Sequence, residues 1–352
     1  MNRKIVIILC LFLAIPLSQL QSFGENREKQ LLKIFHSSPQ EKLKKTRWDD
    51  GSTTVSNESR LELFYPYLFN TRGGYVGIGG TQNFLLASWA NAEWVWLMDF
   101  TSRVVAANKI QIVFLKESKT PKDFLSLWKY KNRRKALKAI KKYYPTRKHY
   151  RYMKSSYRLS RYYMNWRFKK LRVLTKKRNY KIWLNEQYLY NRIRNLALKN
   201  RIIALKGNLY GSRTMRGIGA RAKKMGVIVR TVYLSNAEEY MVRYTANFRK
   251  NILSLPYDST SWLFRTTSAR KWLFPWSPDS KICSSRGFHY NVTKSHDFSQ
   301  WLTKGNRYVR VFTTMNDGII AGSKGFSIAK GPQLELHKKF LKKKKKKKKI
   351  KK

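Results

Sequence analysis

Short apolar runs alternate along the chain with segments of helical pattern, and this alternation predicts the fold. Residues 73–80, Gly-Gly-Tyr-Val-Gly-Ile-Gly-Gly, have the pattern of a buried strand that enters a glycine turn. A helix is expected over residues 83–91, with Thr81 as its N-cap, because several apolar side chains follow the turn there. A second buried strand over residues 94–99 ends on a carboxylate, that of Asp99.

The alternation resumes in the second half of the chain. A strand that begins at residue 202 leads into a turn at Gly207, and a helix over residues 212–225 follows, with Gly226 as its C-cap. Another helix is expected from residue 238, because carboxylates suit the first turn of a helix. The strands expected in this half cover residues 202–209, 227–234, 262–264 and 308–313. The repeated alternation indicates an α/β fold with a Rossmann-like, mostly parallel sheet flanked by helices.

In such a sheet, ligands bind at the carboxyl ends of the strands. Glycines let the backbone approach a ligand, and the helix that follows offers free N–H groups. Asp99 lies 22 residues after Gly77, where an acidic residue holds ribose hydroxyls in dinucleotide-binding proteins. The alternative is that the glycines only make a tight turn and that Asp99 caps the next helix. The predicted cofactor site comprises Gly77, Gly79, Gly80, Gln82, Asn83, Asp99, Asn208, Ser235 and Asn236.

The N-terminus has the pattern of a secretory signal peptide. Two basic residues precede an apolar run over residues 5–17 that is short for a membrane span. Small residues at positions minus three and minus one fit a cut after Gly24. A lipoprotein cut before Cys10 and an uncleaved membrane anchor are the alternatives. We therefore predict an exported protein, either periplasmic, on the cell surface or secreted.

The formal net charge of +56 is unevenly distributed. Residues 129–178 hold 21 Lys and Arg together with ten aromatic residues, and no acidic residue lies between Asp123 and Glu186. Such charge attracts polyanions, and we expect acidic glycans, anionic lipid or nucleic acid to bind the 129–178 stretch and the lysine-rich end of the chain. The aromatic rings can stack on bases or sugars. The alternative is that these rings pack on the core and the cations face water.

These features divide the chain into four parts. They are a signal peptide over 1–24, a lead-in segment over 25–60, a Rossmann-like domain over 61–335 and a disordered lysine-rich tail over 336–352. We expect the lead-in segment to hold a short helix around residues 29–35 and to contribute little to the core. A basic, aromatic-rich helical insertion at about 125–200 interrupts the domain. Cleavage after Gly24 leaves Cys283 as the one cysteine, so stability must come from a packed core.

Several segments together resemble one group of proteins. They are Tyr-Val-Gly-Ile-Gly-Gly-Thr-Gln-Asn-Phe at 75–84, Leu-Met-Asp at 97–99, Gly-Asn-Leu-Tyr-Gly at 207–211, Tyr-Leu-Ser-Asn-Ala-Glu-Glu-Tyr at 233–240 and Leu-Pro-Tyr-Asp at 255–258. The group is an uncharacterised bacterial family of exported proteins, found in spirochaetes among others, with a Rossmann fold like that of S-adenosylmethionine-dependent methyltransferases. The resemblance implies an S-adenosylmethionine pocket at Gly77, Gly79 and Asp99. The chain departs from the methyltransferase pattern because Gly73 and Gly74, and no acidic residue, precede Tyr75.

Other chemistry has little support in the sequence. No metal site is predicted, because no histidine has a histidine partner four residues on or a neighbouring cysteine pair. The nucleophile elbow of hydrolases and the phosphate loop of nucleotide hydrolases are both missing. Three hypotheses are left open: a methyltransferase-like enzyme or cofactor binder, a non-catalytic exported protein that binds polyanions, and a cytoplasmic nucleic-acid binder whose N-terminus only mimics a signal.

Overall fold

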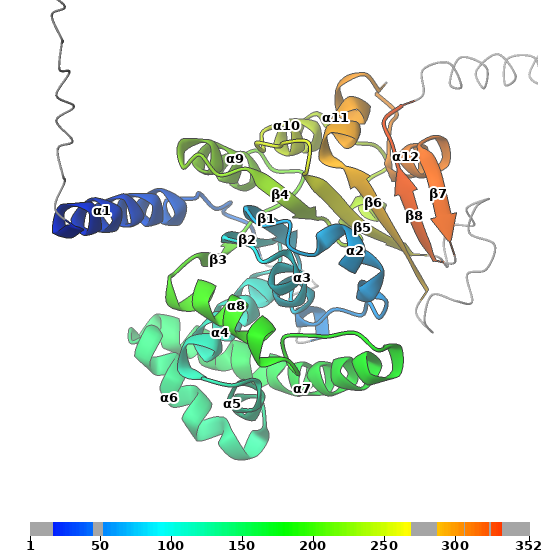
Figure 1. Ribbon diagram of the computed structural model, residues 1–352. Helices are drawn as coiled ribbons and strands as arrows, with labels where there is room; N and C mark the ends of the chain where they lie inside the picture. Colours follow the sequence, from blue (N-terminus) through cyan, green and yellow to red (C-terminus); the bar gives the residue numbers. More distant parts are fainter. Residues whose placement is uncertain (1–16, 45–51, 269–286, 306, 324, 333–352) are drawn as a thin grey trace, which may run out of the picture.

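The computed structural model describes residues 17–44, 52–268, 287–305, 307–323 and 325–332. Within these residues, eight strands form one sheet of order β3-β2-β1-β4-β5-β6-β8-β7 (Figure 1). The strands are β1 (Gly74–Ile78), β2 (Trp94–Asp99), β3 (Ile202–Lys206), β4 (Val229–Tyr233), β5 (Trp262–Ser268), β6 (Phe288–Lys294), β7 (Ile319–Ser323) and β8 (Phe326–Ala329). Much of the predicted signal peptide, Cys283 and the lysine-rich tail lie outside the described residues.

The half of the sheet from β3 to β5 is parallel throughout. β1 pairs with β2 and β4, β2 also pairs with β3, and β4 also pairs with β5. The other half is mixed, because β5 and β6 are antiparallel, β6 and β8 are parallel, and β7 and β8 are antiparallel. The order β3-β2-β1-β4-β5 is compatible with a Rossmann-like fold. The predicted α/β class, with a mostly parallel sheet flanked by helices, is confirmed.

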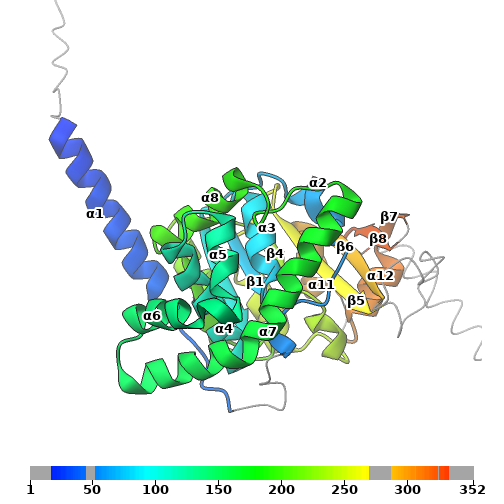
Figure 2. The ribbon, with the colours of Figure 1, turned by 90° about the horizontal axis from the view of Figure 1, so that it is seen from below.

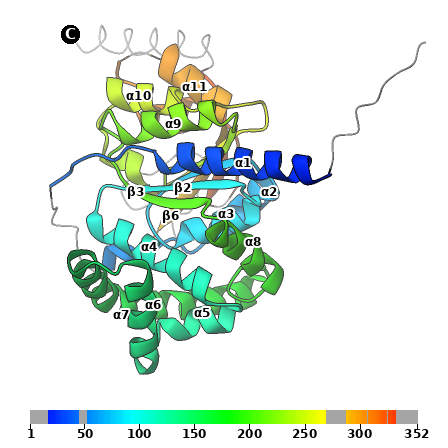
Figure 3. The same ribbon diagram turned by 90° about the vertical axis from the view of Figure 1, so that its left-hand side faces the viewer.

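Helices cover both faces of the sheet, and Figure 3 shows the two layers. One face packs against α3 (Gln82–Ala90) and α4 (Ser102–Glu117). On these two helices pack α5 (Pro121–Leu127), α6 (Arg133–Tyr143), α7 (Arg147–Arg178) and α8 (Gln187–Leu198), and the whole layer shares one apolar core. The other face packs against α1 (Leu17–His36), α9 (Thr214–Lys224), α10 (Ala246–Leu253) and α11 (Ser295–Thr303). Neighbouring side chains of a strand alternate between the two cores: Tyr75 belongs to the first and Val76 to the second. Both faces are therefore apolar, which explains the uninterrupted apolar runs in the sequence.

The connection from β2 to β3 contains five helices, α4 to α8, and they lie on one side of the sheet (Figure 2). Some aromatic residues of the basic stretch pack in the core, and others are exposed, where they can stack on a ligand. Tyr157 and Phe168 of α7 are buried in the core, whereas Tyr130 and Tyr162 are more than half exposed. The guanidinium groups of Arg133 and Arg161 lie 4.3 and 4.8 Å from the centre of the Tyr130 ring.

The segment before residue 61 contributes more to the core than its polar sequence suggests. Phe35, at the end of α1, is fully buried with its ring centre 5.0 Å from that of Trp94 and 4.8 Å from that of Trp96. Trp96 also donates a hydrogen bond from Nε1 to Ser38 Oγ at 3.1 Å. One fully buried apolar side chain in a charged segment therefore suffices to dock the end of α1 on the sheet. Among the helices of the described residues, none is long and apolar enough to cross a membrane.

Two elements of the second half differ from the prediction. Residues 308–313 do not form a strand: a turn leads at residue 311 into α12 (Val311–Asp317). Within the first turn of α12, the hydroxyl of Thr314 donates a hydrogen bond to the carbonyl of Val311 at 2.8 Å. Six residues rich in β-branched side chains are too few to separate strand from helix. The expected helix from residue 238 is only the short 3₁₀ helix η4 (Ala237–Tyr240).

The buried imidazole of His289 makes the stability of the fold depend on pH. Burial lowers the pKa of His289 in β6 to about 3, from 6.5 in the unfolded chain. Below pH 6.5 the unfolded chain takes up a proton that the folded protein excludes, so stability falls as the pH falls. We expect this residue to lower the free energy of unfolding by about 2 kcal/mol between pH 6.5 and 4.5. Urea denaturation at a series of pH values checks this: His289→Gln should have a shallower slope, and equal slopes would contradict it.

Candidate functional site

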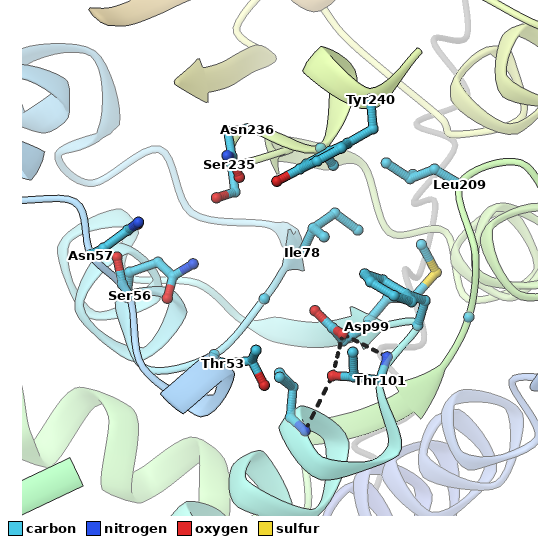
Figure 4. Close-up of a pocket in the computed structure, with 18 of the residues that line it drawn as sticks. Thr53, Ser56, Asn57, Ile78, Asp99, Thr101, Leu209, Ser235, Asn236 and Tyr240 are labelled. Atoms are coloured by element: carbon cyan, nitrogen blue, oxygen red, sulfur yellow. Dashed lines mark hydrogen bonds between the residues drawn. The ribbon is translucent and has the colours of Figure 1, made fainter. Parts of the chain in front are cut away.

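A cleft of about 670 Å³ lies at the carboxyl ends of β1 to β4, where ligands bind in parallel sheets (Figure 4). Its wall brings together seven of the predicted site residues, namely Gly79, Gly80, Gln82, Asp99, Asn208, Ser235 and Asn236. These residues follow four different strands. Parallel pairing of the strands gathers them at one edge of the sheet, which is why the sequence could indicate their proximity.

Gly77 and Asn83, the other two predicted site residues, do not line the cleft. Asn83 is fully buried and accepts a hydrogen bond from the hydroxyl of Tyr75 at 2.7 Å. Its amide group donates to the carbonyls of Ile78 and Gly80 at 3.1 and 3.2 Å. A Cβ atom on Gly77 would lie 2.0 Å from Asn83 Oδ1. Gly77 therefore makes room for Asn83, and Asn83 fixes the shape of the turn.

The glycine turn after β1 is partly covered by the chain itself. A Cβ atom on Gly80 would lie 2.4 Å from the carbonyl oxygen of Thr54, in the 3₁₀ helix η1 (Ser52–Thr54). Thr81 is the N-cap residue of α3 as expected, but its side chain makes no capping hydrogen bond, and its hydroxyl accepts one from the backbone nitrogen of Ser56 at 3.2 Å. Gly79 has a φ of +96° that favours glycine. The turn therefore serves the packing of residues 52–56 as well as the cleft.

Asp99 is held in a fixed orientation at the wall of the cleft. Its Oδ1 accepts hydrogen bonds from the backbone nitrogen and the hydroxyl of Thr101, both at 2.8 Å. Thr101 is the N-cap of α4 and accepts a hydrogen bond from Val104. Thr101 and not Asp99 is therefore the cap of α4, so the alternative interpretation was wrong on this point; Asp99 holds the cap residue in place and also lines the cleft. These two roles do not exclude each other.

The N-terminus of α9, next to Asn208, is occupied by an acidic side chain that the sequence did not point to. The carboxylate of Glu41 accepts hydrogen bonds from the backbone nitrogens of Asn208, Arg213 and Thr214 at 3.0, 3.0 and 3.1 Å. Free N–H groups at a helix start favour an anion. Glu41 supplies that anion, so the N–H groups at the start of α9 are already occupied, and Asn208 offers the cleft its side chain.

A second missed carboxylate, Glu58, lies at the base of the cleft. Its Oε1 accepts hydrogen bonds from the hydroxyls of Tyr233, Ser235 and Thr266, and its Oε2 accepts one from Ser56 at 2.7 Å. Ser235 has a φ of +52°, uncommon for a residue other than glycine, and this backbone directs its hydroxyl to Glu58. No sequence motif indicates a role for Glu58, and its role is visible only from these hydrogen bonds in the structure.

The charge of Glu58 affects its buried neighbours. Burial and this negative charge together raise the pKa of Tyr233 and of Tyr75 well above their ordinary value, so both hydroxyls stay protonated. Burial lowers the pKa of Arg167, a residue of α7 that is 2% exposed, and the carboxylate of Glu58 opposes this. Arg167 also donates to the backbone carbonyl of Glu58. Residues 52–60 are thus anchored to the basic helix.

Four partly exposed aromatic side chains stand around the cleft: Phe100, Trp166, Tyr210 and Tyr240. Phe100 follows Asp99 directly, and the hydroxyl of Tyr210 donates to the carbonyl of Tyr240 at 2.8 Å. Flat apolar faces beside a carboxylate suit a ligand that joins an aromatic base to a hydroxyl-bearing ring. Among the described residues, no group of three or more His, Cys, Asp or Glu could hold a metal ion.

The fold and the cleft define an α/β protein whose candidate site lies at the carboxyl ends of parallel strands. Comparison with known families matches residues 53–330 to "Domain of unknown function (DUF7790)". Because the match covers most of the chain, the protein belongs to this family. No curated protein matches the chain.

Proposed function

We propose that the cleft binds a nucleoside-containing ligand of the S-adenosylmethionine type, and that the protein is methyltransferase-like in fold. The observation that carries this proposal is the pair Asp99 and Phe100 at the end of β2. A carboxylate at this position suits the hydroxyls of a ribose, and the adjacent ring can stack on a base. The volume of about 670 Å³ lies in the range of small-molecule sites.

The proposal does not need a catalytic acid or base in the cleft. Transfer of an activated methyl group depends mainly on the position of the acceptor relative to the donor. If the protein is an enzyme, it is therefore of the S-adenosylmethionine-dependent methyltransferase type. The N-terminal pattern supports the further proposal that the protein is exported.

Titration of S-adenosylmethionine into the full chain, at about physiological ionic strength, tests this function. We expect binding in the wild type that is weakened about tenfold or more in Asp99→Asn, since a neutral amide accepts hydroxyl hydrogen bonds less strongly. The amide oxygen can still accept from Thr101, so the start of α4 is kept. Asp123→Asn, a change of the same kind outside the cleft, should bind like the wild type. A folded wild-type protein that gives no heat of binding would refute the proposal.

A second candidate function rests on the exposed face of α6 and α7. Tyr162 and Trp166 are partly exposed there, and Lys170 Nζ lies 5.0 Å from the centre of the Trp166 ring. Exposed rings among cations suit polyanions such as acidic glycans, anionic lipid or nucleic acid. We propose polyanion binding through this face and the lysine-rich tail as the alternative, non-catalytic function. It predicts binding that survives Asp99→Asn and weakens steeply with salt.

A further inference from the structure

A second pocket of about 300 Å³ lies on the α4 side of the sheet, next to the ends of β2 and β3. Ser102 and Lys109 come from α4, Lys206 from the end of β3, and His149 and Tyr152 from α7. Tyr144, in the turn between α6 and α7, and Gln40 complete the polar groups of its wall. All seven side chains carry a hydrogen-bond donor, and no carboxylate is among the described residues that line the pocket.

The ammonium group of Lys109 is poorly compensated. No hydrogen bond or ion pair joins it to any residue that the structure describes, and burial lowers the pKa of its side chain. By contrast, Lys206 Nζ donates to Ser102 Oγ at 2.6 Å and to the carbonyl of Leu43 at 2.7 Å. The Lys109 side chain is half-buried, and a cation that is partly removed from water is stabilised by an anion beside it.

The hydroxyl of Tyr144 also fits an anion. Burial raises the pKa of Tyr144 to about 12, so this group stays protonated and can donate. His149 and Tyr152 are exposed and stand at the opening. Cations on the inside and hydroxyl donors around them are the arrangement that a tetrahedral oxyanion needs.

We propose that this pocket binds an oxyanion group of the phosphate or sulfate type, with Lys109 and Lys206 as its cationic donors and Tyr144 as a neutral donor. The pocket and the cleft are lined by consecutive residues of the chain, since Ser102 of the pocket follows Thr101 of the cleft and Lys206 of the pocket precedes Gly207 of the cleft. The oxyanion is therefore either free or the phosphate of a nucleotide in the cleft. The site does not depend on the function proposed for the cleft, because S-adenosylmethionine carries no phosphate.

Calorimetric titration and thermal unfolding of the full chain test the site, with sodium sulfate as the probe and sodium chloride keeping the ionic strength constant. We expect sulfate to bind and to raise the Tm of the wild type more than chloride does. Lys109→Met should weaken sulfate binding about tenfold or more. The variant should fold, because it replaces a half-buried cation, which makes no hydrogen bond to any described residue, with an apolar side chain of similar length. Without sulfate its Tm should equal or exceed that of the wild type.

A matched control separates this site from the general attraction of anions to so basic a protein. Lys135→Met removes the same charge from the exposed face of α6 and should bind sulfate like the wild type. Adenosine and adenosine 5′-monophosphate distinguish the two sources of the anion. If the phosphate improves binding only while Lys109 is present, and sulfate alone is not bound, the anion belongs to a nucleotide. If neither probe depends on Lys109, the proposal is refuted, whatever the result with S-adenosylmethionine.

Discussion

Replacement of Glu58 by alanine is expected to lower the free energy of unfolding by about 3–5 kcal/mol. The change removes the acceptor of four hydroxyl groups, those of Ser56, Tyr233, Ser235 and Thr266. It also removes the nearest negative charge from the buried guanidinium of Arg167. Unpaired buried polar groups are costly, and a buried charge without its counter-charge is costlier. Chemical denaturation followed by circular dichroism measures the loss.

Two further variants test whether the loss of stability in Glu58→Ala comes from the missing carboxylate charge. Glu93→Ala, which breaks an exposed ion pair with Arg72, should change stability by less than about 1 kcal/mol. Combining Glu58→Ala with Arg167→Met should recover part of the loss, because the double variant leaves no buried cation uncompensated. If Glu58→Ala is as stable as the wild type, the carboxylate does not organise the base of the cleft.

Gly77→Ala is expected to cost about 3 kcal/mol or more, although it adds a single methyl group. The new Cβ atom would lie 2.0 Å from Asn83 Oδ1 and 2.6 Å from the ring of Tyr75. Asn83 would have to move and release its three hydrogen bonds inside the core. Denaturation curves give the change in stability.

The control for Gly77→Ala is Gly226→Ala, at the end of α9. Gly226 has a φ of +68°, and its surroundings leave open space for a methyl group. Its replacement should therefore cost only about 1 kcal/mol, from backbone strain. Gly77→Ala combined with Asn83→Ala should be more stable than the sum of the two losses predicts, since the clash with Asn83 disappears while the contact with Tyr75 remains. If the two losses of stability simply add, Gly77 matters for a reason other than its close approach to Asn83.

Sequence alone could indicate much of the fold because the central strands are apolar throughout and separated by clear turn residues. The end of α9 just before Gly226 also follows from local chemistry: Met225 is the C-cap, and the predicted cap Gly226 is the next residue, with a positive φ and with its nitrogen donating to Lys223 O at 3.0 Å. The gathering of Gly79, Asp99 and Asn208 follows from parallel pairing alone. Each of these inferences needs only a short window of sequence and one general rule about sheets.

The remaining parts of the site depend on contacts between distant residues. Glu58 meets Tyr233 across 175 positions, and Glu41 meets Thr214 across 173. Neither acid belongs to a local pattern, and both lie in a segment that reads as polar and exposed. Trp166 was visible as an aromatic residue of the basic stretch, but only the path of α7 brings it to the cleft.

The position of Glu41 has a consequence for self-association. β3 lies at the end of the strand order, so no other strand of the described residues pairs with its outer backbone groups. Exposed edges of this kind invite pairing between molecules. The backbone nitrogen of Glu41 donates to the carbonyl of Lys206 at 3.0 Å, and the nitrogen of Lys206 donates to Gln40 Oε1 at 2.9 Å. The segment that anchors α1 thus also closes the carboxyl end of this edge against a second sheet.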